Sequence, residues 1–181
     1  MYKAIGVIEL KSIPKGVEAA DAALKSANID MVSAHPACPG KYEIILTGSI
    51  SNVSAAVSHI NSKFDGYVID SSVMGTIDEQ VIAALFSTGE GERCGSLGLI
   101  ETFSAASAIK AADLAVKTAK VKIYDLRVSR GMGGKGVVML TGDIGDVSAA
   151  VEAGAEYAKG VASLSSTAVI AAPHEDLWSQ M

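Results

Sequence analysis

The chain has 181 residues, of which 49% are hydrophobic and only 5% aromatic, and its formal net charge is −5 at pH 7. This acidic balance, without a basic cluster, disfavours a nucleic-acid partner, and no apolar run reaches the roughly 18 residues that a membrane span needs. The N-terminus lacks the layout of a signal peptide and the two cysteines form no disulfide framework, so we expect a protein of the reducing cytosol.

The first half of the chain begins with a strand and a helix. Residues 4–10 form a short apolar run with β-branched members, which predicts a strand. Residues 14–28 predict a helix, because Pro14 suits a first helical turn and apolar side chains recur at helical spacing. Two further strands are expected over 29–33 and 42–47.

A loop rich in proline and glycine, residues 35–41, separates these two strands. Residues 51–64 predict a second helix, with Ser51 or Asn52 as its N-cap. A fourth strand and a short third helix are expected over 67–74 and 77–85. The order strand, helix, strand, strand, helix, strand is that of the split β-α-β, or ferredoxin-like, arrangement. The predicted fold class is therefore α/β in the broad sense, or more narrowly α+β, with an antiparallel sheet and helices on one face.

The second half of the chain repeats the first. Residues 5–9 (IGVIE) return as 97–101 (LGLIE), a shift of 92, and 53–57 (VSAAV) return unchanged as 147–151, a shift of 94. A repeat of this length is a duplicated domain, because solenoid units are much shorter. The predicted boundaries are 1–88 for the first domain, 94–181 for the second and 89–93 for the linker.

Several segments together resemble a known family. The opening residues 4–10, the helix segment 19–27 (AADAALKSA) and the closing 173–178 (PHEDLW) resemble bacterial microcompartment shell proteins. The duplication resembles the tandem-domain members of this family, which form trimers. The loop 37–41 (ACPGK) is similar to that of the tandem shell proteins of propanediol-utilisation compartments, a subfamily with an iron–sulfur cluster at its central pore.

The resemblance implies a shell tile, in which three chains form a flat pseudohexagonal homotrimer that packs with other shell proteins of the compartment. Lys25 and Lys117 match the family's tile-edge lysine, whereas Ala172 replaces an arginine that reaches across the tile edge, so edge packing is expected to be weaker or to use other residues. The loops before the third strand of each domain, 36–41 and 130–135, would line the central pore. The expected pore-lining residues are Ala37, Pro39, Gly40, Met132, Gly133 and Gly134.

The resemblance also implies that Cys38 is a metal ligand. One cysteine cannot hold an iron–sulfur cluster, which usually has four protein ligands, but a trimer brings three thiolates to one axis. One [4Fe-4S] cluster per trimer would then keep its fourth iron for water, a small molecule or a partner. Met132 takes the matching place in the second domain, so the site has three thiolates rather than six. The residue pattern alone favours an ordinary cysteine in a turn.

Other polar residues have simpler explanations. Residues 131–136 (GMGGKG) lack the spacing of a phosphate-binding loop and precede a strand, which favours a flexible pore-lining turn. His35, three residues before Cys38, is expected either to donate a hydrogen bond to a metal-bound thiolate, or to bind the metal itself, or, as is more common, to be an exposed loop histidine. Cys94 is expected to be an unpaired thiol beside the linker. Glu9 and Glu101 occupy equivalent strand ends, where a structural hydrogen bond explains both.

We therefore expect a structural protein rather than an enzyme, since no nucleophile triad, metal-protease or dinucleotide-binding pattern appears. With a cluster, the pore would carry electron transfer to a redox protein inside the compartment or in the cytosol, or would let the cluster itself pass through for repair, and the sequence does not separate these two roles. One alternative is a metal-free passive metabolite pore in the shell. Another is a trimeric ferredoxin-like regulator that binds a small ligand.

Overall fold

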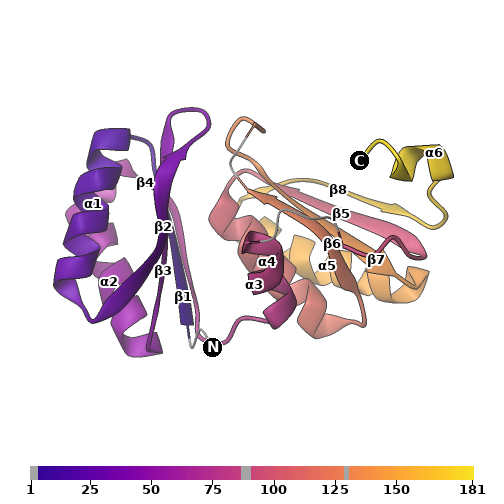
Figure 1. The fold of residues 1–181 in the computed structure, drawn as a ribbon, viewed down its shortest axis with the longest axis horizontal. Helices are drawn as coiled ribbons and strands as arrows, with labels where there is room; N and C mark the ends of the chain where they lie inside the picture. Colours follow the sequence, from indigo (N-terminus) through magenta and orange to yellow (C-terminus); the bar gives the residue numbers. More distant parts are fainter. Residues whose placement is uncertain (1–3, 87–90, 129–130) are drawn as a thin grey trace. The chain divides into compact units, whose positions relative to one another are not determined.

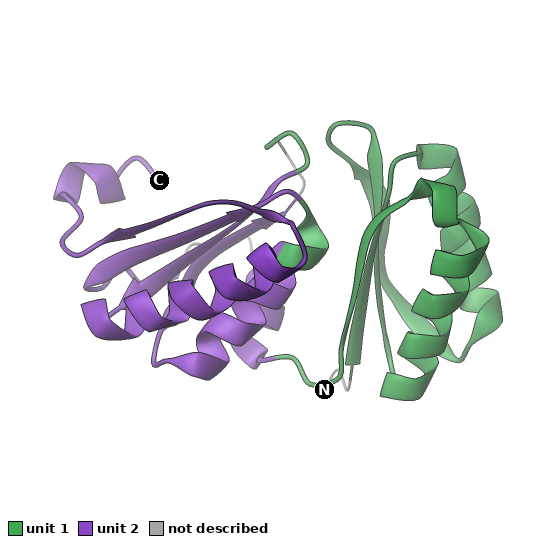
Figure 2. Cartoon of the chain, turned by 180° about the vertical axis from the view of Figure 1, so that it is seen from behind, with its two compact units in different colours: residues 1–77, 104–107, 129–134 green, residues 78–103, 108–128, 135–181 purple. Residues whose placement is uncertain are grey.

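The computed structural model describes residues 4–86, 91–128 and 131–181, in two compact units (Figures 1 and 2). The first unit contains residues 1–77 together with the short segments 104–107 and 129–134, and the second contains 78–103, 108–128 and 135–181. Each unit has a four-stranded antiparallel sheet of its own. Of the predicted linker 89–93, residues 89 and 90 lie outside the described residues.

The first unit has the strand order β2-β3-β1-β4, with α1 and α2 on one face of the sheet (Figure 1). Its β1 strand lies between β3 and β4, and both pairings are antiparallel. Its elements are β1 Ala4–Leu10, α1 Ile13–Ser26, β2 Ile29–Ala37, β3 Lys41–Gly48, α2 Ile50–Lys63, a 3-10 turn Asp65–Tyr67 and β4 Val68–Met74.

The second unit repeats this topology with the order β6-β7-β5-β8 and adds the short helices α3 and α6. Its elements are α3 Glu79–Phe86, β5 Ser96–Thr102, α4 Ala105–Thr118, β6 Lys122–Val128, β7 Gly136–Gly142, α5 Ile144–Gly160, β8 Leu164–Ile170 and α6 Glu175–Trp178. The predicted α+β class, with antiparallel sheets and helices, is confirmed. No helix among the described residues is long and apolar enough to span a membrane.

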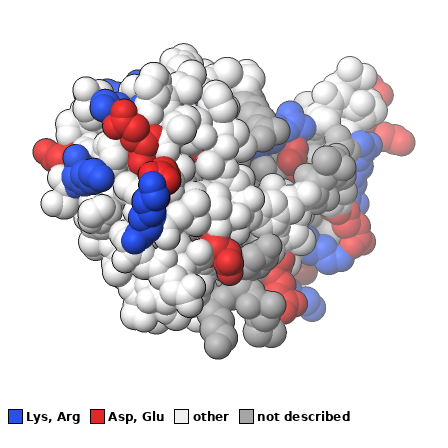
Figure 3. Space-filling view, turned by 60° about the vertical axis from the view of Figure 1, so that its left-hand side comes forward, with Lys and Arg blue, Asp and Glu red and all other residues white. Residues whose placement is uncertain are grey.

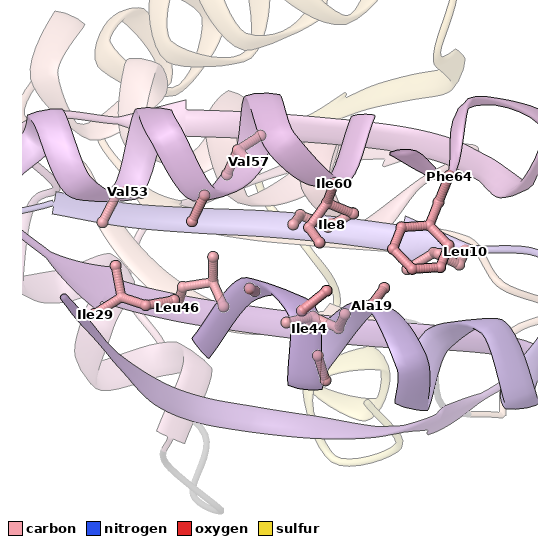
Figure 4. Close-up of a cluster of buried hydrophobic side chains, with 14 of the residues drawn as sticks. Ile8, Leu10, Ala19, Ile29, Ile44, Leu46, Val53, Val57, Ile60 and Phe64 are labelled. Carbon is pink, nitrogen blue, oxygen red and sulfur yellow. The ribbon is translucent and has the colours of Figure 1, made fainter. Parts of the chain in front are cut away.

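The core of the first unit lies between the sheet and its two helices (Figure 4). Ile8 on β1 stands opposite Ile44 on β3, and both side chains are fully buried. Because side chains alternate across a strand, these positions share one face of the sheet. Val53, Val57 and Ile60 recur on α2 at helical spacing and cover that face.

Two local predictions are wrong. The second strand does not end at residue 33 but continues to Ala37, so that Pro36 pairs opposite Tyr42. A proline fits here because β2 is an edge strand, where a missing N–H leaves no neighbouring strand unpaired. The N-cap of the second helix is Ser49, whose extended backbone lets its hydroxyl accept the Asn52 N–H at 3.2 Å.

Close packing of α1 on β3 gives the first testable prediction. A Cβ atom at Gly16 would lie 2.3 Å from the Cβ and Cγ atoms of Tyr42, which is buried. Gly16→Ala is therefore expected to destabilise the fold by about 1–3 kcal/mol. This loss exceeds the stability gained because alanine has a higher helix propensity than glycine. Urea unfolding followed by circular dichroism measures this.

The matched control is Gly145→Ala on α5, where an added Cβ meets no atom within 4 Å. This variant is expected to unfold at the wild-type urea concentration or slightly above it, because alanine is the better helix former. Equal midpoints for the Gly16→Ala variant and the wild type would show that α1 does not press on Tyr42 as described.

Candidate functional site

The predicted metal ligand Cys38 lies in a tight turn between β2 and β3 and is exposed. The turn is closed by the N–H of Gly40, which donates to the carbonyl of Ala37 at 3.0 Å. Gly40 has a φ of +89°, a conformation that side chains rarely adopt, so glycine suits this position. The turn therefore presents the thiol at one end of the first sheet.

A second glycine-rich segment of the first unit, 131–134, lies against this turn. The Lys41 Nζ donates to the Gly134 carbonyl at 3.0 Å. A Cβ on Gly134 would lie 2.6 Å from the Cys38 carbonyl oxygen and 2.9 Å from the Pro39 Cδ, and the Gly134 φ is +83°. Backbone contact this close requires glycine at position 134. The need for glycine here therefore comes from packing against the Cys38 turn, and phosphate binding is not needed to explain it. Arg130, from the predicted loop 130–135, lies outside the described residues.

An open hollow of about 370 Å³ borders the turn within the first unit. Cys38 lies on its wall, together with His35 and Pro36 from β2 and Gly131 from the second segment. His35 belongs to β2 and not to the loop, and its side chain is about one quarter exposed. The hollow thus gives solvent a direct path to the cysteine.

A row of titratable side chains crosses the first sheet next to this turn. The strand registers place His35 opposite Glu43, Glu43 opposite Glu9, and Glu9 opposite Asp70, so all four share one face. Glu9 and Glu43 are almost fully buried. The His35 Nε2 lies 3.8 Å from the Glu43 Oε1, and the Lys41 Nζ lies 3.9 Å from the Glu9 Oε1. The Lys41 ammonium group, next to the turn, therefore offsets part of the negative charge of the carboxylates in the row.

The last member of the row, Asp70, fixes a further segment of the first unit. Its Oδ2 accepts hydrogen bonds from the hydroxyls of Ser104 and Ser107, the latter at 2.8 Å. Ser104 in turn accepts the Ser107 N–H at 3.1 Å. Glu43 and Asp70 were not among the predicted site residues. For Glu43, the signal in the sequence is the pair of charges in Lys41-Tyr42-Glu43, at the start of an otherwise largely apolar strand.

The second unit has a related but more exposed cluster around Glu101. Its Oε2 accepts hydrogen bonds from Ser165 at 2.5 Å, Lys135 at 2.9 Å and Ser166 at 3.3 Å. These bonds, that from Ser165 first and that from Lys135 next, hold the pKa of the Glu101 carboxyl below its usual value. A lysine at the start of the third strand thus pairs with a glutamate at the end of the first in both units.

A titration tests the Glu101 cluster. Removing the ammonium group in Lys135→Met is expected to move the pKa of Glu101 part of the way back toward 4.5, its ordinary value. Because the folded-state pKa is lowered, the ionised cluster stabilises the fold above pH 4.5, and this stabilisation is lost as the pH falls through the lowered pKa. NMR titration of the Glu101 carboxyl carbon measures the shift. The control is Lys122→Met, which should leave the pKa of Glu101 unchanged. If Lys135→Met also leaves this pKa unchanged, Lys135 does not stabilise the ionised Glu101 carboxyl.

The two predicted tile-edge lysines occupy the last turns of α1 and α4. Lys25 pairs with Asp21 at 2.6 Å, and both side chains are well exposed. Lys117 pairs with Asp113 at 2.7 Å, but Asp113 is buried. Figure 3 shows that lysines and acidic residues lie side by side over the helices of the first unit, between larger uncharged areas. Lys25 is therefore the freer of the two for contacts with a neighbour.

The described part of one chain contains no group of three or more histidine, cysteine, aspartate or glutamate side chains that could hold a metal. Cys94, the other cysteine of the chain, points its Sγ at the Thr141 hydroxyl at 3.6 Å in the second unit. A thiolate site at Cys38 therefore requires cysteines from more than one chain. Because Cys38 is exposed, its thiol is accessible to a metal that thiols of other chains also bind.

Comparisons with known proteins agree with the duplication. The model of the BMC domain matches residues 4–77 and again 96–173. The bacterial microcompartment shell protein PduT of Citrobacter freundii is 38% identical over 181 residues, covering 100% of this chain and 98% of that protein. The shell protein EutM of Escherichia coli K12 is 40% identical over 82 residues, which are 45% of this chain and 82% of EutM.

A solved structure agrees along the whole chain. A microcompartments protein from Desulfitobacterium hafniense DCB superimposes with a TM-score of 0.84 at 38% sequence identity, covering 99% of each chain. A fused permuted hexameric shell protein, MSM0275 from the RMM microcompartment, has a TM-score of 0.66 at 24% identity, which shows a shared fold alone.

Proposed function

Because the chain belongs to the BMC-domain family of bacterial microcompartment shell proteins, we propose that it forms a trimeric shell tile whose central pore holds an iron–sulfur cluster bound by Cys38. The tandem pair of BMC domains and the structural role in a microcompartment shell follow from the family. The predicted family and the predicted location in the shell are thereby confirmed. The trimer, the pore and the cluster are the finer parts of the proposal.

The duplication is the main support for the trimer. EutM, a shell protein that matches 45% of this chain, has the size of one BMC domain, whereas this chain has two. Three chains would therefore supply six domains to one ring, and a head-to-tail contact that closes after three steps gives such a ring. A tile of this kind would assemble with other shell proteins at its edges.

The single observation that supports the cluster is the exposed Cys38, in the turn between β2 and β3. The second repeat of the sequence has Met132 at the matching place, so each chain offers one thiolate and a trimer offers three. The residues fit the group in their chemistry, because thiolates are the usual ligands of iron–sulfur clusters. When bound, the cluster would supply one-electron transfer between redox proteins on the two sides of the shell.

A metal-free metabolite pore is the second candidate. It is favoured by the residue pattern, because a lone cysteine in a turn is weak evidence for a metal site. In that case the predicted pore-lining residues Ala37, Pro39, Gly40, Met132, Gly133 and Gly134 would surround an open channel. PduT and EutM are shell proteins by name, which favours a shell protein over a small-ligand regulator. A role without catalysis is part of the proposal.

Tiling tests the shell part of the proposal. Lys25→Ala is expected to reduce sheet formation at least several-fold while trimers persist, because the exposed Lys25 would contact a neighbouring tile. Sheets are counted by negative-stain electron microscopy, and trimers by native mass. Lys117 is the less clean target, since removing it leaves the buried Asp113 carboxylate without this partner.

The matched control is Lys159→Ala, an exposed lysine in the last turn of α5. It should form sheets as the wild type does. If Lys25→Ala and Lys159→Ala tile equally well, the edge assignment of Lys25 is wrong.

A further inference from the structure

The same helix face is buried in the second unit and exposed in the first. Ile109 on α4 is fully buried and Asp113 is 1% exposed. At the repeat positions on α1, Val17 is 53% exposed and the Asp21 side chain 61% exposed. The neighbouring Leu24 is 48% exposed as well. An apolar stripe with one carboxylate in it therefore lies open on α1, as is typical of an interaction surface.

In the second unit, the segment that contains the short helix α3 contacts the corresponding carboxylate and strand edge. The N–H of Asp78, just before α3, donates to the Asp113 Oδ1 at 2.9 Å, and Val81 of α3 is fully buried. The helix packs on β6, the edge strand of its sheet. The Gln80 side chain accepts the Ile123 N–H at 3.4 Å and donates to the Val121 carbonyl at 3.5 Å. The α3 segment thus both satisfies the buried carboxylate and closes the strand edge.

The first unit has the same edge without such a helix among its described residues. Its edge strand is β2, which carries a bulge between Met31 and Ser33 where β6 has one between Ile123 and Asp125. The Asp21 carboxylate on α1 pairs with the exposed Lys25 instead of a backbone N–H. The exposed α1 residues Val17, Asp21 and Leu24, together with the edge of β2 from Ile29 to Met31, are called the α1–β2 surface below.

The repeat identifies the counterpart of α3 as α6. Met74 pairs with Ile5, and Ile170 pairs with the equivalent Leu97, so the chain after these strands repeats with a shift of 96. Leu177 on α6 is 39% exposed, in contrast to its counterpart Val81. The repeat sets His174 equivalent to Asp78, Asp176 to Gln80 and Leu177 to Val81. Within the described residues, the α1–β2 surface therefore lacks the helix found on its counterpart, and α6 carries an apolar side chain that is partly exposed.

We propose that the C-terminal segment 173–181 of one chain docks on the α1–β2 surface of a second copy, in the way that α3 docks in the second unit. This inference rests on the proposed trimer, because a contact from the end of one chain to the start of the next closes a ring. The segment takes the place of α3, with Leu177 over the exposed apolar residues of α1.

Charge complementarity supports this occupant. The backbone N–H and the imidazole of His174 would meet the Asp21 carboxylate, as the Asp78 N–H meets Asp113. The Asp176 carboxylate would accept the Met31 N–H and lie near the Lys25 ammonium group. Asp176 lacks the amide donor of Gln80, so the equivalent bond to the Ile29 carbonyl is absent. In the single chain, the Trp178 ring of α6 lies edge-on to Tyr124 at 5.4 Å, a contact that docking would replace.

Disulfide trapping between chains tests the docking. The experiment uses full-length chains with Cys38→Ser and Cys94→Ser, so that no native thiol interferes. Chains with Asp21→Cys are mixed with chains with His174→Cys, allowed to exchange subunits and oxidised. The expected result is a covalent two-chain product on a non-reducing gel, because the docked geometry brings the two Cα atoms within the roughly 4.4–6.8 Å of a disulfide.

Two controls fix the interpretation. The double variant Asp78→Cys with Asp113→Cys in one chain should close an internal disulfide, since these residues are already in contact. A mixture of Asp113→Cys and His174→Cys chains should give no two-chain product. A trimeric parent protein that closes the internal control but gives no Asp21–His174 link would overturn the docking alone. A parent protein that is monomeric by native mass would overturn the proposed trimer and the docking with it.

A second variant does not depend on cysteines. Leu177→Asp changes an exposed side chain, so folding should be unaffected. It is expected to raise the protein concentration needed for trimers at least tenfold, whereas Ile144→Asp, at a similarly exposed residue on α5, should not. Trp178 is the only tryptophan of the chain, so its fluorescence should shift to the blue on assembly. Unchanged trimerisation by Leu177→Asp would contradict the docking.

Discussion

Protein purified without oxygen is expected to be brown and to carry about four irons per trimer, and Cys38→Ser is expected to lose both the colour and the iron. A serine hydroxyl is a poor ligand for the iron of a sulfide cluster, and the described residues of one chain offer no other three-ligand metal group. Visible absorption and iron analysis of the anaerobic protein measure the effect. The trimer should persist, because we assign its contacts to apolar and backbone groups and not to the metal.

The matched control for Cys38→Ser is Cys94→Ser. Cys94 contacts Thr141 in the second unit and is partly buried, so its replacement should leave colour and iron unchanged. Air should bleach the wild type, because Cys38 is exposed and an open iron would be accessible to solvent. If carefully reconstituted wild-type protein binds no iron, or if Cys38→Ser retains it, the metal-free pore becomes the better account.

Gly134→Ala is expected to disturb the Cys38 turn far more than Gly133→Ala. Both glycines have positive φ, +83° and +63°, so an alanine carries a similar backbone cost of about 1–2 kcal/mol at either position. At Gly134 the new Cβ would also lie 2.6 Å from the Cys38 carbonyl oxygen, whereas at Gly133 it would meet no atom within 4 Å. The contact at Gly134 is expected to add about 1–3 kcal/mol of destabilisation.

Two measurements separate these variants. Urea unfolding gives the stability difference, and the rate at which a maleimide labels Cys38 in the metal-free protein reports on the turn itself. Gly134→Ala should change the labelling rate and lower the iron content after reconstitution, and Gly133→Ala should do neither. Equal labelling rates and equal stability in the two variants would show that Gly134 does not press against the turn.

The order of strands and helices could be predicted from the sequence because apolar periodicity and the internal repeat both point to the same arrangement. The extent of β2 could not, since Pro36 and the nearby glycine look like loop residues until the strand is known to lie at an edge. The N-cap at Ser49 was missed for a similar reason, because Ser49 and Ser51 are equally good caps in sequence and only backbone conformation separates them.

The site was predicted only in part. Cys38 and its loop stand out by residue type, but the row from His35 through Glu43 and Glu9 to Asp70 depends on strand register. Register brings together residues from four strands, and a sequence pattern within one strand cannot reveal it. The different burial of Asp21 and Asp113 is likewise invisible in the repeat, because both are aspartates in closely similar segments, AADAALK at 19–25 and AADLAVK at 111–117.

The central claim is that three of these chains close into one tile, and native mass spectrometry of the wild-type protein at micromolar concentration tests it most directly. The account predicts a single species of three times the chain mass, and a further increment for one cluster when the protein is prepared without oxygen. A monomer or a dimer at that concentration would contradict the trimeric tile.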